Sequence, residues 1–130
     1  MSQQHLSNQL RNRVLSSLTE GDLALIEPFF EPVALKFRQR LESANKRIRK
    51  AYFPNRGIAS VVAVTAVGRR QAEVALVGRN GMTGLAVVLG ADSSPYETFI
   101  QIAGDGQSIA ADDLRRVMEK STSIRACFLR

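Results

Sequence analysis

The residue types most able to act as a catalytic base or nucleophile near neutral pH occur once each, as His5 and Cys127. His5 lies in the first turn of a predicted helix, a poor position for a buried general base. Cys127 falls on the apolar face of the last predicted helix, where a small buried residue is more typical than a nucleophile. One histidine and one cysteine also exclude an internal disulfide and a four-ligand Cys/His zinc site. We therefore expect no catalytic residue, no metal, no cofactor and no enzymatic activity.

Three glycines form the one pattern with binding character. Gly78, Gly81 and Gly84 are spaced by three, and the apolar segment 82–90 predicts one or two turns of buried helix ending at Gly90. Free N–H groups at the start of such a helix can receive an anion, but tight turns leading into a buried helix need the same glycines. The spacing matches neither the P-loop nor the dinucleotide-binding fingerprint. Both interpretations stay open.

The positive charge is concentrated in one segment. The chain carries 18 Lys and Arg against 12 Asp and Glu, a formal net charge of +6. Residues 36–50 contain seven basic residues and one acid, Glu42, and hold the whole excess. A solvated strand face accounts for this pattern and discourages edge pairing. The alternative is a surface for an anionic partner such as nucleic acid.

Hydrophobic spacing divides the chain into helices at both ends with strands between them. Helices are expected within residues 5–30, because Leu6, Leu10, Val14 and Leu18 recur every four residues and Thr19 can cap a second helix. From Val33 to Leu41 the period changes to two, which predicts a strand. Further strands are predicted at 48–53, 58–65, 71–77, 98–102 and 107–110, with turns at 54–57, 67–69, 78–81, 91–95 and 104–106. Many short strands at this spacing predict a sandwich or barrel over residues 31–110.

Residues 112–130 are predicted to be helical again. Asp112 or Asp113 can cap the first of two helices. The second segment, 123–130, has one apolar side made of Ile124, Cys127 and Phe128. These three side chains either complete the core of the chain or form the seam of a homodimer, and the sequence leaves both alternatives open.

Several segments, in their order and spacing, resemble the sensor domain of Crp/Fnr-type bacterial transcription regulators. The resemblance covers about Leu6 to Arg130, and it is carried by Tyr52-Phe53-Pro54, Gly57-Ile58-Ala59-Ser60, Val77-Gly78-Arg79-Asn80-Gly81-Met82-Thr83-Gly84, Leu89-Gly90 and Gln101-Ile102-Ala103-Gly104. It implies the cyclic-nucleotide-binding-domain fold: a mainly β, antiparallel double-stranded β-helix (jelly roll) of eight strands with flanking helices. It also implies that the short helix lies in a phosphate-binding cassette.

Family members that bind cyclic AMP carry Gly-Glu-(Leu/Ala) in this cassette and Arg-(Ser/Thr)-Ala about ten residues later, for the ribose hydroxyl and the cyclic phosphate. Here the first motif aligns as Gly84-Leu85-Ala86, and the second falls near Pro95-Tyr96-Glu97-Thr98. No arginine lies between Arg79 and Arg115. Both charged contacts are missing, and a buried phosphate without a partner costs several kcal/mol.

We therefore expect that cyclic AMP and cyclic GMP do not bind. The resemblance implies a smaller and more apolar pocket, whose candidate ligand-binding residues are Gly84, Leu85, Ala86, Tyr96 and Thr98, with Val88 as a further lining residue.

Length and composition fit one domain, with 130 residues of which 45% are hydrophobic and 23% charged. No apolar stretch nears the roughly 18 residues that a membrane span needs, and the first residues lack a signal-peptide pattern. A cytoplasmic location without membrane contact is expected. Regulators of the resembled type continue into a dimerisation helix and a helix-turn-helix domain, whereas this sequence ends at Arg130, so DNA contact is expected only through a C-terminal domain outside these residues.

The expected function is thus the sensor module of a Crp/Fnr-like transcription regulator. It would form a homodimer through its C-terminal helix and respond to an unknown small-molecule or protein effector. The alternatives are a stand-alone protein-interaction domain and a direct nucleic-acid binder that uses residues 36–50.

Overall fold

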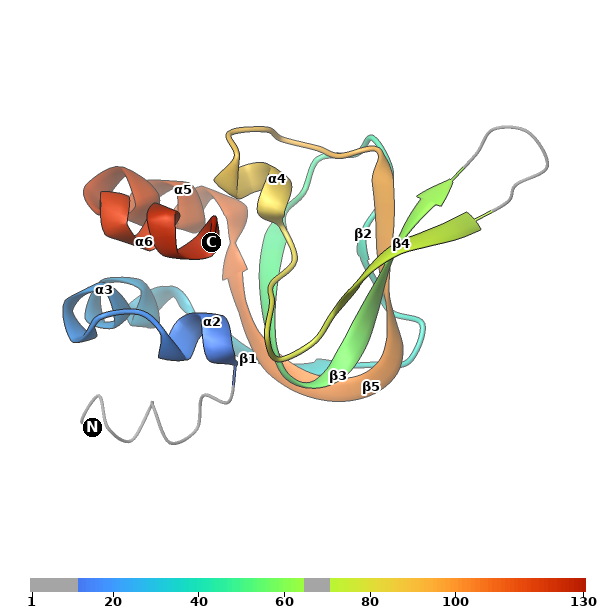
Figure 1. Cartoon of the computed structure of the whole chain (residues 1–130), viewed down its shortest axis with the longest axis horizontal. Helices are drawn as coiled ribbons and strands as arrows, with labels where there is room; N and C mark the ends of the chain where they lie inside the picture. Colours follow the sequence, from blue (N-terminus) through green and yellow to red (C-terminus); the bar gives the residue numbers. More distant parts are fainter. Residues whose placement is uncertain (1–11, 65–70) are drawn as a thin grey trace.

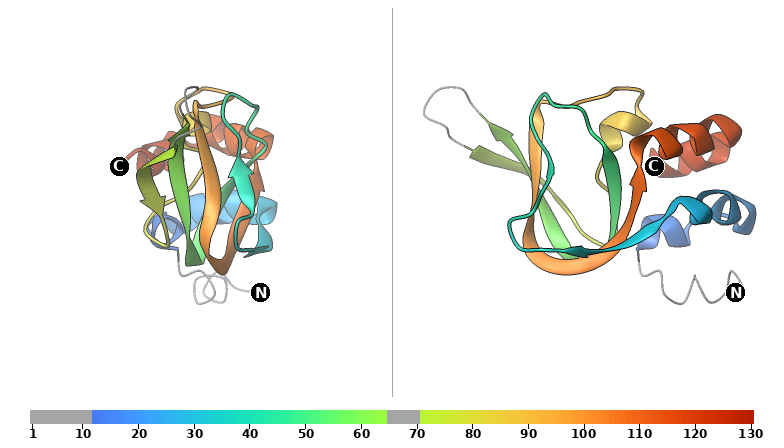
Figure 2. Two further views of the ribbon diagram at one scale, coloured as in Figure 1. Left: turned by 90° about the vertical axis from the view of Figure 1, so that its right-hand side faces the viewer. Right: turned by 180° about the vertical axis from the view of Figure 1, so that it is seen from behind.

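The structure is a computed structural model that describes residues 12–64 and 71–130. Its strands form one antiparallel sheet that curls into a barrel-like body, and most of its helices gather at one end of the strands (Figures 1 and 2). This confirms the predicted mainly β fold with flanking helices. In chain order the elements are α2 (Arg13–Ser16), α3 (Glu20–Ile26), the 3-10 turn η1 (Glu27–Phe29), β1 (Glu31–Leu35), β2 (Arg40–Glu42), β3 (Lys50–Val64), β4 (Gln71–Val77), α4 (Leu85–Val88), β5 (Tyr96–Ala110), α5 (Ala111–Lys120) and α6 (Thr122–Phe128).

Strands β3 and β5 form the frame of the barrel. Each is 15 residues long, and they pair from Lys50 opposite Ala110 to Ala63 opposite Tyr96. β1 and β2 pair with β5, and β4 pairs with β3. The register between β3 and β5 shifts at three places within residues 54–59, so both strands bend sharply there. Each long strand therefore runs along more than one side of the barrel (Figure 1).

The turns predicted at 54–57 and 104–106 are wrong, because both segments lie inside these bent strands. A Cβ on Gly104 would lie 2.1 Å from the Arg56 carbonyl oxygen, and one on Gly106 would lie 2.4 Å from that of Phe53. Glycine is needed here because the two backbones approach closely at the bend.

The strand predicted from Val33 to Leu41 is interrupted, since residues 36–39 form a turn between β1 and β2. Arg38 adopts a φ of 67°, and the N–H of Gln39 donates to the Lys36 carbonyl at 2.9 Å. The alternating pattern continued through this turn and so concealed it. The strand predicted at 71–77 is confirmed as β4, whereas the turn predicted at 67–69 lies outside the described residues.

Within the described residues, the predicted N-terminal helices correspond to short helical segments. Helical turns are confirmed at α2 and α3, and the Thr19 side chain caps α3 by accepting from the Asp22 N–H. His5, Leu6 and Leu10 lie outside the described residues. Buried Asn12 fixes α2 to the barrel: its side-chain amide donates to the carbonyls of Pro54 and Gly81, both at 2.8 Å.

At the C-terminal end, two helices are confirmed, but the prediction that Asp112 or Asp113 caps the first is wrong. The N-cap of α5 is Ala110, and both aspartates lie in the first turn, where a negative charge is still favourable.

The main core lies between the barrel and the helices at its end. The Phe53 ring of β3 is at its centre, with ring centroids of Phe30 and Phe128 at 5.7 and 5.6 Å. A second, smaller cluster of Leu35, Ala59 and Ile100 fills the part of the sheet farther from the helices.

Candidate functional site

Helix α4 is held by the residues immediately before it. The Thr83 backbone N–H donates to the Tyr52 carbonyl, and the Thr83 hydroxyl accepts from the Tyr52 N–H, both at 3.0 Å. Gly84 has a φ of 79°, and a Cβ on it would lie 2.9 Å from the Ala51 Cβ. Only glycine fits both the conformation and the space. The predicted short helix is thus confirmed as α4, which ends at Val88, and Gly90 follows two residues later with a φ of 93°.

The glycines before α4 are explained by backbone geometry. The N–H of Gly81 donates to the Gly78 carbonyl at 3.0 Å, which closes a tight turn. Together with the left-handed conformation of Gly84, this favours the interpretation of the glycine pattern as structural turns.

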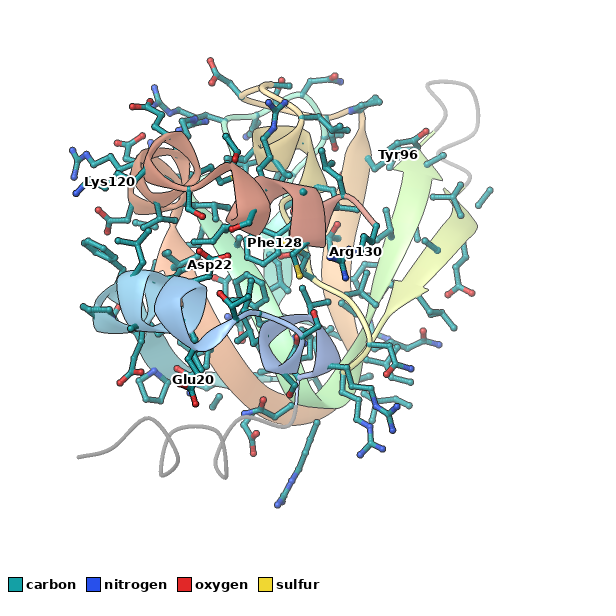
Figure 3. The ribbon with its side chains drawn as sticks, turned by 60° about the vertical axis from the view of Figure 1, so that its left-hand side comes forward. Glu20, Asp22, Tyr96, Lys120, Phe128 and Arg130 are labelled. Carbon is teal, nitrogen blue, oxygen red and sulfur yellow. The ribbon has the colours of Figure 1, made fainter. Side chains whose placement is uncertain are left out.

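A cavity of about 590 Å³ lies between α4 and the strands. All five candidate ligand-binding residues line it: Gly84, Leu85, Ala86, Tyr96 and Thr98. Figure 3 shows Tyr96 at the end of β5 that is far from the terminal helices. The remaining lining residues are apolar (Val61, Val74, Ala75, Val77, Met82, Leu89, Ala91 and Pro95) or polar (Glu42, Thr83, Ser93 and Ser94).

One predicted lining residue does not reach the cavity. Val88 is only 1% exposed and packs into the main core on the opposite side of α4. The prediction for Val88 is therefore wrong, because successive residues of a helix point in different directions.

Glu42 is the cavity residue that sequence reasoning missed. It ends β2, and its Oε2 accepts a hydrogen bond of 2.7 Å from the backbone N–H of Gly84. Its Oε1 has no hydrogen-bond partner within residues 12–64 and 71–130. Burial raises the pKa of Glu42, and the Gly84 N–H opposes this rise. Since 42 residues separate Glu42 from Gly84, no local pattern links them.

The cavity therefore has an unusual charge. Where the chain is described, no Lys, Arg or His side chain lines it, and Glu42 is its one ionisable carboxyl group. The sequence suggests that the N–H groups at the start of α4 could bind an anion, but the first of them, that of Gly84, already donates to the Glu42 carboxylate.

Helix α4 also contacts the C-terminal helices. Leu85 and Ala86 line the cavity, whereas Val87 and Val88 are buried in the main core with residues of α5 and α6. The Arg125 side chain on α6 donates from Nε to the Val88 carbonyl at 3.1 Å. One short helix thus has the cavity on one side and the end of the chain on the other.

A second set of polar contacts joins α3 to the start of α6. The hydroxyl of Ser121 donates to Oδ1 of Asp22 at 2.7 Å, and that of Ser123 donates to Oδ2. These hydrogen bonds, that of Ser123 first, lower the pKa of Asp22. Figure 3 shows Asp22 between α3 and the C-terminal helices.

The candidate dimer residues are mostly internal. Ile124 is 0% and Phe128 5% exposed, and both belong to the main core (Figure 3 labels Phe128). Cys127 is partly buried, with its Sγ 3.1 Å from the Ser17 hydroxyl. The structure therefore favours the first alternative, completion of the core, for Ile124 and Phe128. The exposed apolar residues left on or just after α6 are Ala126 and Leu129.

The basic segment 36–50 is exposed but not gathered in one place. All seven of its basic residues are exposed, and three form ion pairs: Arg40 with Glu97, Arg47 with Asp112, and Lys50 with Glu31. The Arg38 N–H bonds to Ile100, whereas Lys50 pairs with Ala110, ten residues farther along β5. This spread does not favour a nucleic-acid surface over a solvated face.

Within residues 12–64 and 71–130, no group of three His, Cys, Asp or Glu side chains could hold a metal ion, and no helix is long and apolar enough to cross a membrane.

The structure resembles known regulatory and sensor domains, although no protein-family model and no curated protein matches the sequence. The sensor domain of the transcriptional regulator DNR from Pseudomonas aeruginosa superposes with a TM-score of 0.75 at 13% identity, over 99% of this chain and 87% of that chain. The regulatory domain of protein kinase A from Toxoplasma gondii, solved with cyclic AMP, gives 0.73 at 18% identity over 95% of this chain. The regulatory subunit of a cyclic-AMP-independent protein kinase A from Trypanosoma brucei gives 0.75 at 10% identity over 92%.

This chain covers 49% and 44% of the lengths of those two kinase regulatory proteins. At these identities the likeness concerns the fold alone. The protein has the fold of cyclic-nucleotide-binding domains and of regulator sensor domains, which confirms the mainly β, antiparallel fold that the resemblance implied. In the described residues the sheet has five strands and not the implied eight, and β3 and β5 each continue through a bend where the sequence predicted two separate strands.

Proposed function

We propose that this protein is the sensor domain of a transcription regulator, and that its cavity does not accept cyclic AMP or cyclic GMP. The observation that carries the proposal is the charge of the cavity, in which the carboxylate of Glu42 stands at the Gly84 N–H and no cationic side chain of the described chain is present.

Electrostatics supports this proposal. A cyclic phosphate carries a negative charge and would lie near Glu42 without a cation to offset either group. Two like charges about 4 Å apart in a partly shielded site repel by about 4 kcal/mol. This corresponds to roughly a thousandfold loss of affinity.

The fold neighbours are consistent with either ligand behaviour. One was solved with cyclic AMP, and another is described as independent of it. Because both share the fold, the residues in the cavity have to decide the question.

The position of α4 supports a mechanism for sensing. A ligand in the cavity that contacts Leu85 and Ala86 would favour one position of α4. Val88 packs in the main core, and its carbonyl accepts a hydrogen bond from Arg125, so these two contacts would transmit a change in the position of α4 to α6. This is a shift between two populations of the same domain. DNA contact through a C-terminal domain, a homodimer through the C-terminal helix, and a cytoplasmic location remain predictions.

Isothermal titration calorimetry with cyclic AMP and cyclic GMP tests the proposal. We expect no saturable heat up to millimolar nucleotide. Glu42→Gln serves as the matched variant, because it removes the repulsion but supplies no cation; it should gain at most weak binding. Saturation of the unchanged protein at micromolar nucleotide would overturn the proposal.

A further inference from the structure

The cavity combines an apolar wall with one polar group. Its volume of about 590 Å³ lies within the range of small-molecule sites. Leu85 and Leu89 on its border are 47% and 65% exposed. Covering such side chains with an apolar ligand removes their surface from water, which favours binding.

The polar group of the cavity is the Glu42 carboxyl, which the chain engages through one oxygen only. Glu42 directs Oε2 to the Gly84 N–H, while Oε1 has no partner in the described part of the chain. A carboxylate that is partly removed from water is stabilised when a cation or a strong hydrogen-bond donor joins it.

The chain does not supply that cation. Arg40, two residues before Glu42 on the same strand, pairs instead with Glu97 at 3.6 Å. Neither Arg40 nor any other Lys or Arg of the described residues lines the cavity. A molecule that enters the cavity can supply the cation that the described lining residues do not provide.

We propose that the cavity binds a small, largely apolar molecule that carries a protonated amine, and that the amine pairs with the carboxylate of Glu42. This inference deepens the proposed function, because it names the class of effector for the sensor cavity. The amine donates to Oε1 and offsets the single charge of the cavity, and the apolar body lies against Leu85 and Leu89.

A series with one hydrocarbon chain and three head groups isolates the role of charge. Hexylamine, 1-hexanol and hexanoate are titrated into the protein at neutral pH, and dissociation constants are taken from NMR shifts of the Leu85 and Leu89 methyl groups. We expect hexylamine to bind most tightly, 1-hexanol at least about tenfold more weakly, and hexanoate not measurably, because only the ammonium brings an opposite charge to the carboxylate and hexanoate brings a like charge.

Two variants test the residue. Glu42→Gln keeps an oxygen for the Gly84 N–H but removes the charge, so the affinity for hexylamine should fall about tenfold while that for 1-hexanol stays within about twofold. Glu97→Gln removes a nearby carboxylate that does not line the cavity, and it should retain the preference for the amine. Thermal unfolding of each variant checks that the fold is intact.

Three outcomes would overturn the inference: equal binding of the three compounds, an amine preference that survives Glu42→Gln, or no binding of any compound at millimolar concentration. None of these affects the proposal on cyclic nucleotides, which fails only if cyclic AMP or cyclic GMP saturates the protein. The two proposals can therefore fail separately.

Discussion

The helical end of the molecule and the cavity end each contain one carboxylate whose pKa is shifted, and the shifts are opposite. At the helical end, hydroxyl groups of Ser123 and Ser121 surround Asp22 and lower its pKa, and the neighbouring apolar side chains are buried. At the cavity, burial raises the pKa of Glu42, which has one hydrogen bond, and apolar side chains such as Leu89 are exposed. At the helical end, side chains of the same chain hydrogen-bond Asp22 and cover the apolar residues. At the cavity, one Glu42 oxygen and the exposed side chain of Leu89 can contact another molecule.

The largest expected contrast concerns apolar side chains. Phe128→Ala removes an aromatic ring from the main core and should lower the free energy of unfolding by about 3 to 5 kcal/mol. Leu89→Ala, at an exposed position on the cavity border, should change it by less than about 0.5 kcal/mol. Urea unfolding followed by circular dichroism measures both. A loss of several kcal/mol for Leu89→Ala would mean that the cavity border is part of the core.

The next contrast concerns the two carboxylates. Asp22→Asn weakens the hydrogen bonds from both serine hydroxyls and should cost about 1 kcal/mol, since these contacts are partly exposed. Glu42→Gln should be neutral or slightly stabilising, because it removes a partly buried charge and keeps an acceptor for Gly84. Destabilisation by Glu42→Gln that exceeds that of Asp22→Asn would contradict this comparison.

The dependence of these effects on pH has opposite signs. The Asp22 pKa is lowered from its usual 3.8, so its contribution is present above that pH and is lost as the pH falls through the lower folded value. The Glu42 pKa is raised from 4.5, so the folded protein loses stability as the pH rises from 4.5 through the folded value. The advantage of Glu42→Gln over the unchanged protein should therefore grow over that second range. Urea unfolding between pH 3 and pH 8 tests both signs.

A small effect on stability is also expected for Arg125→Gln. Arg125 is exposed, and its one bond to the Val88 carbonyl should contribute no more than about 1 kcal/mol. The same change should nevertheless reduce the NMR shifts that a cavity ligand causes in α6, while leaving those in α4 intact. If the shifts in α6 persist unchanged in Arg125→Gln, this bond does not transmit the state of the cavity.

Local features were predictable from the sequence, whereas features that depend on distant neighbours were not. The Thr19 cap and the short helix just before Gly90 follow from adjacent residues, and the sequence predicts both. Gly104 and Gly106 looked like turn residues because their reason lies in β3, which approaches them across the sheet.

The candidate site shows the same limit. The five ligand-binding candidates line one cavity because they flank the same short segment of sequence. In the sequence, Glu42 is the one acid of the basic segment 36–50. Nothing near it in the sequence indicates that its carboxylate accepts a hydrogen bond from Gly84.

The hydrogen bond from Arg125 goes to a main-chain carbonyl, and this has a consequence for how such a domain can diverge. Every amino acid at position 88 offers the same acceptor, and the residues that line the cavity are not part of the bond. Substitutions that adapt the binding site to a new compound would therefore leave the connection to the last helix in place. Recognition and signal output can then change independently of each other.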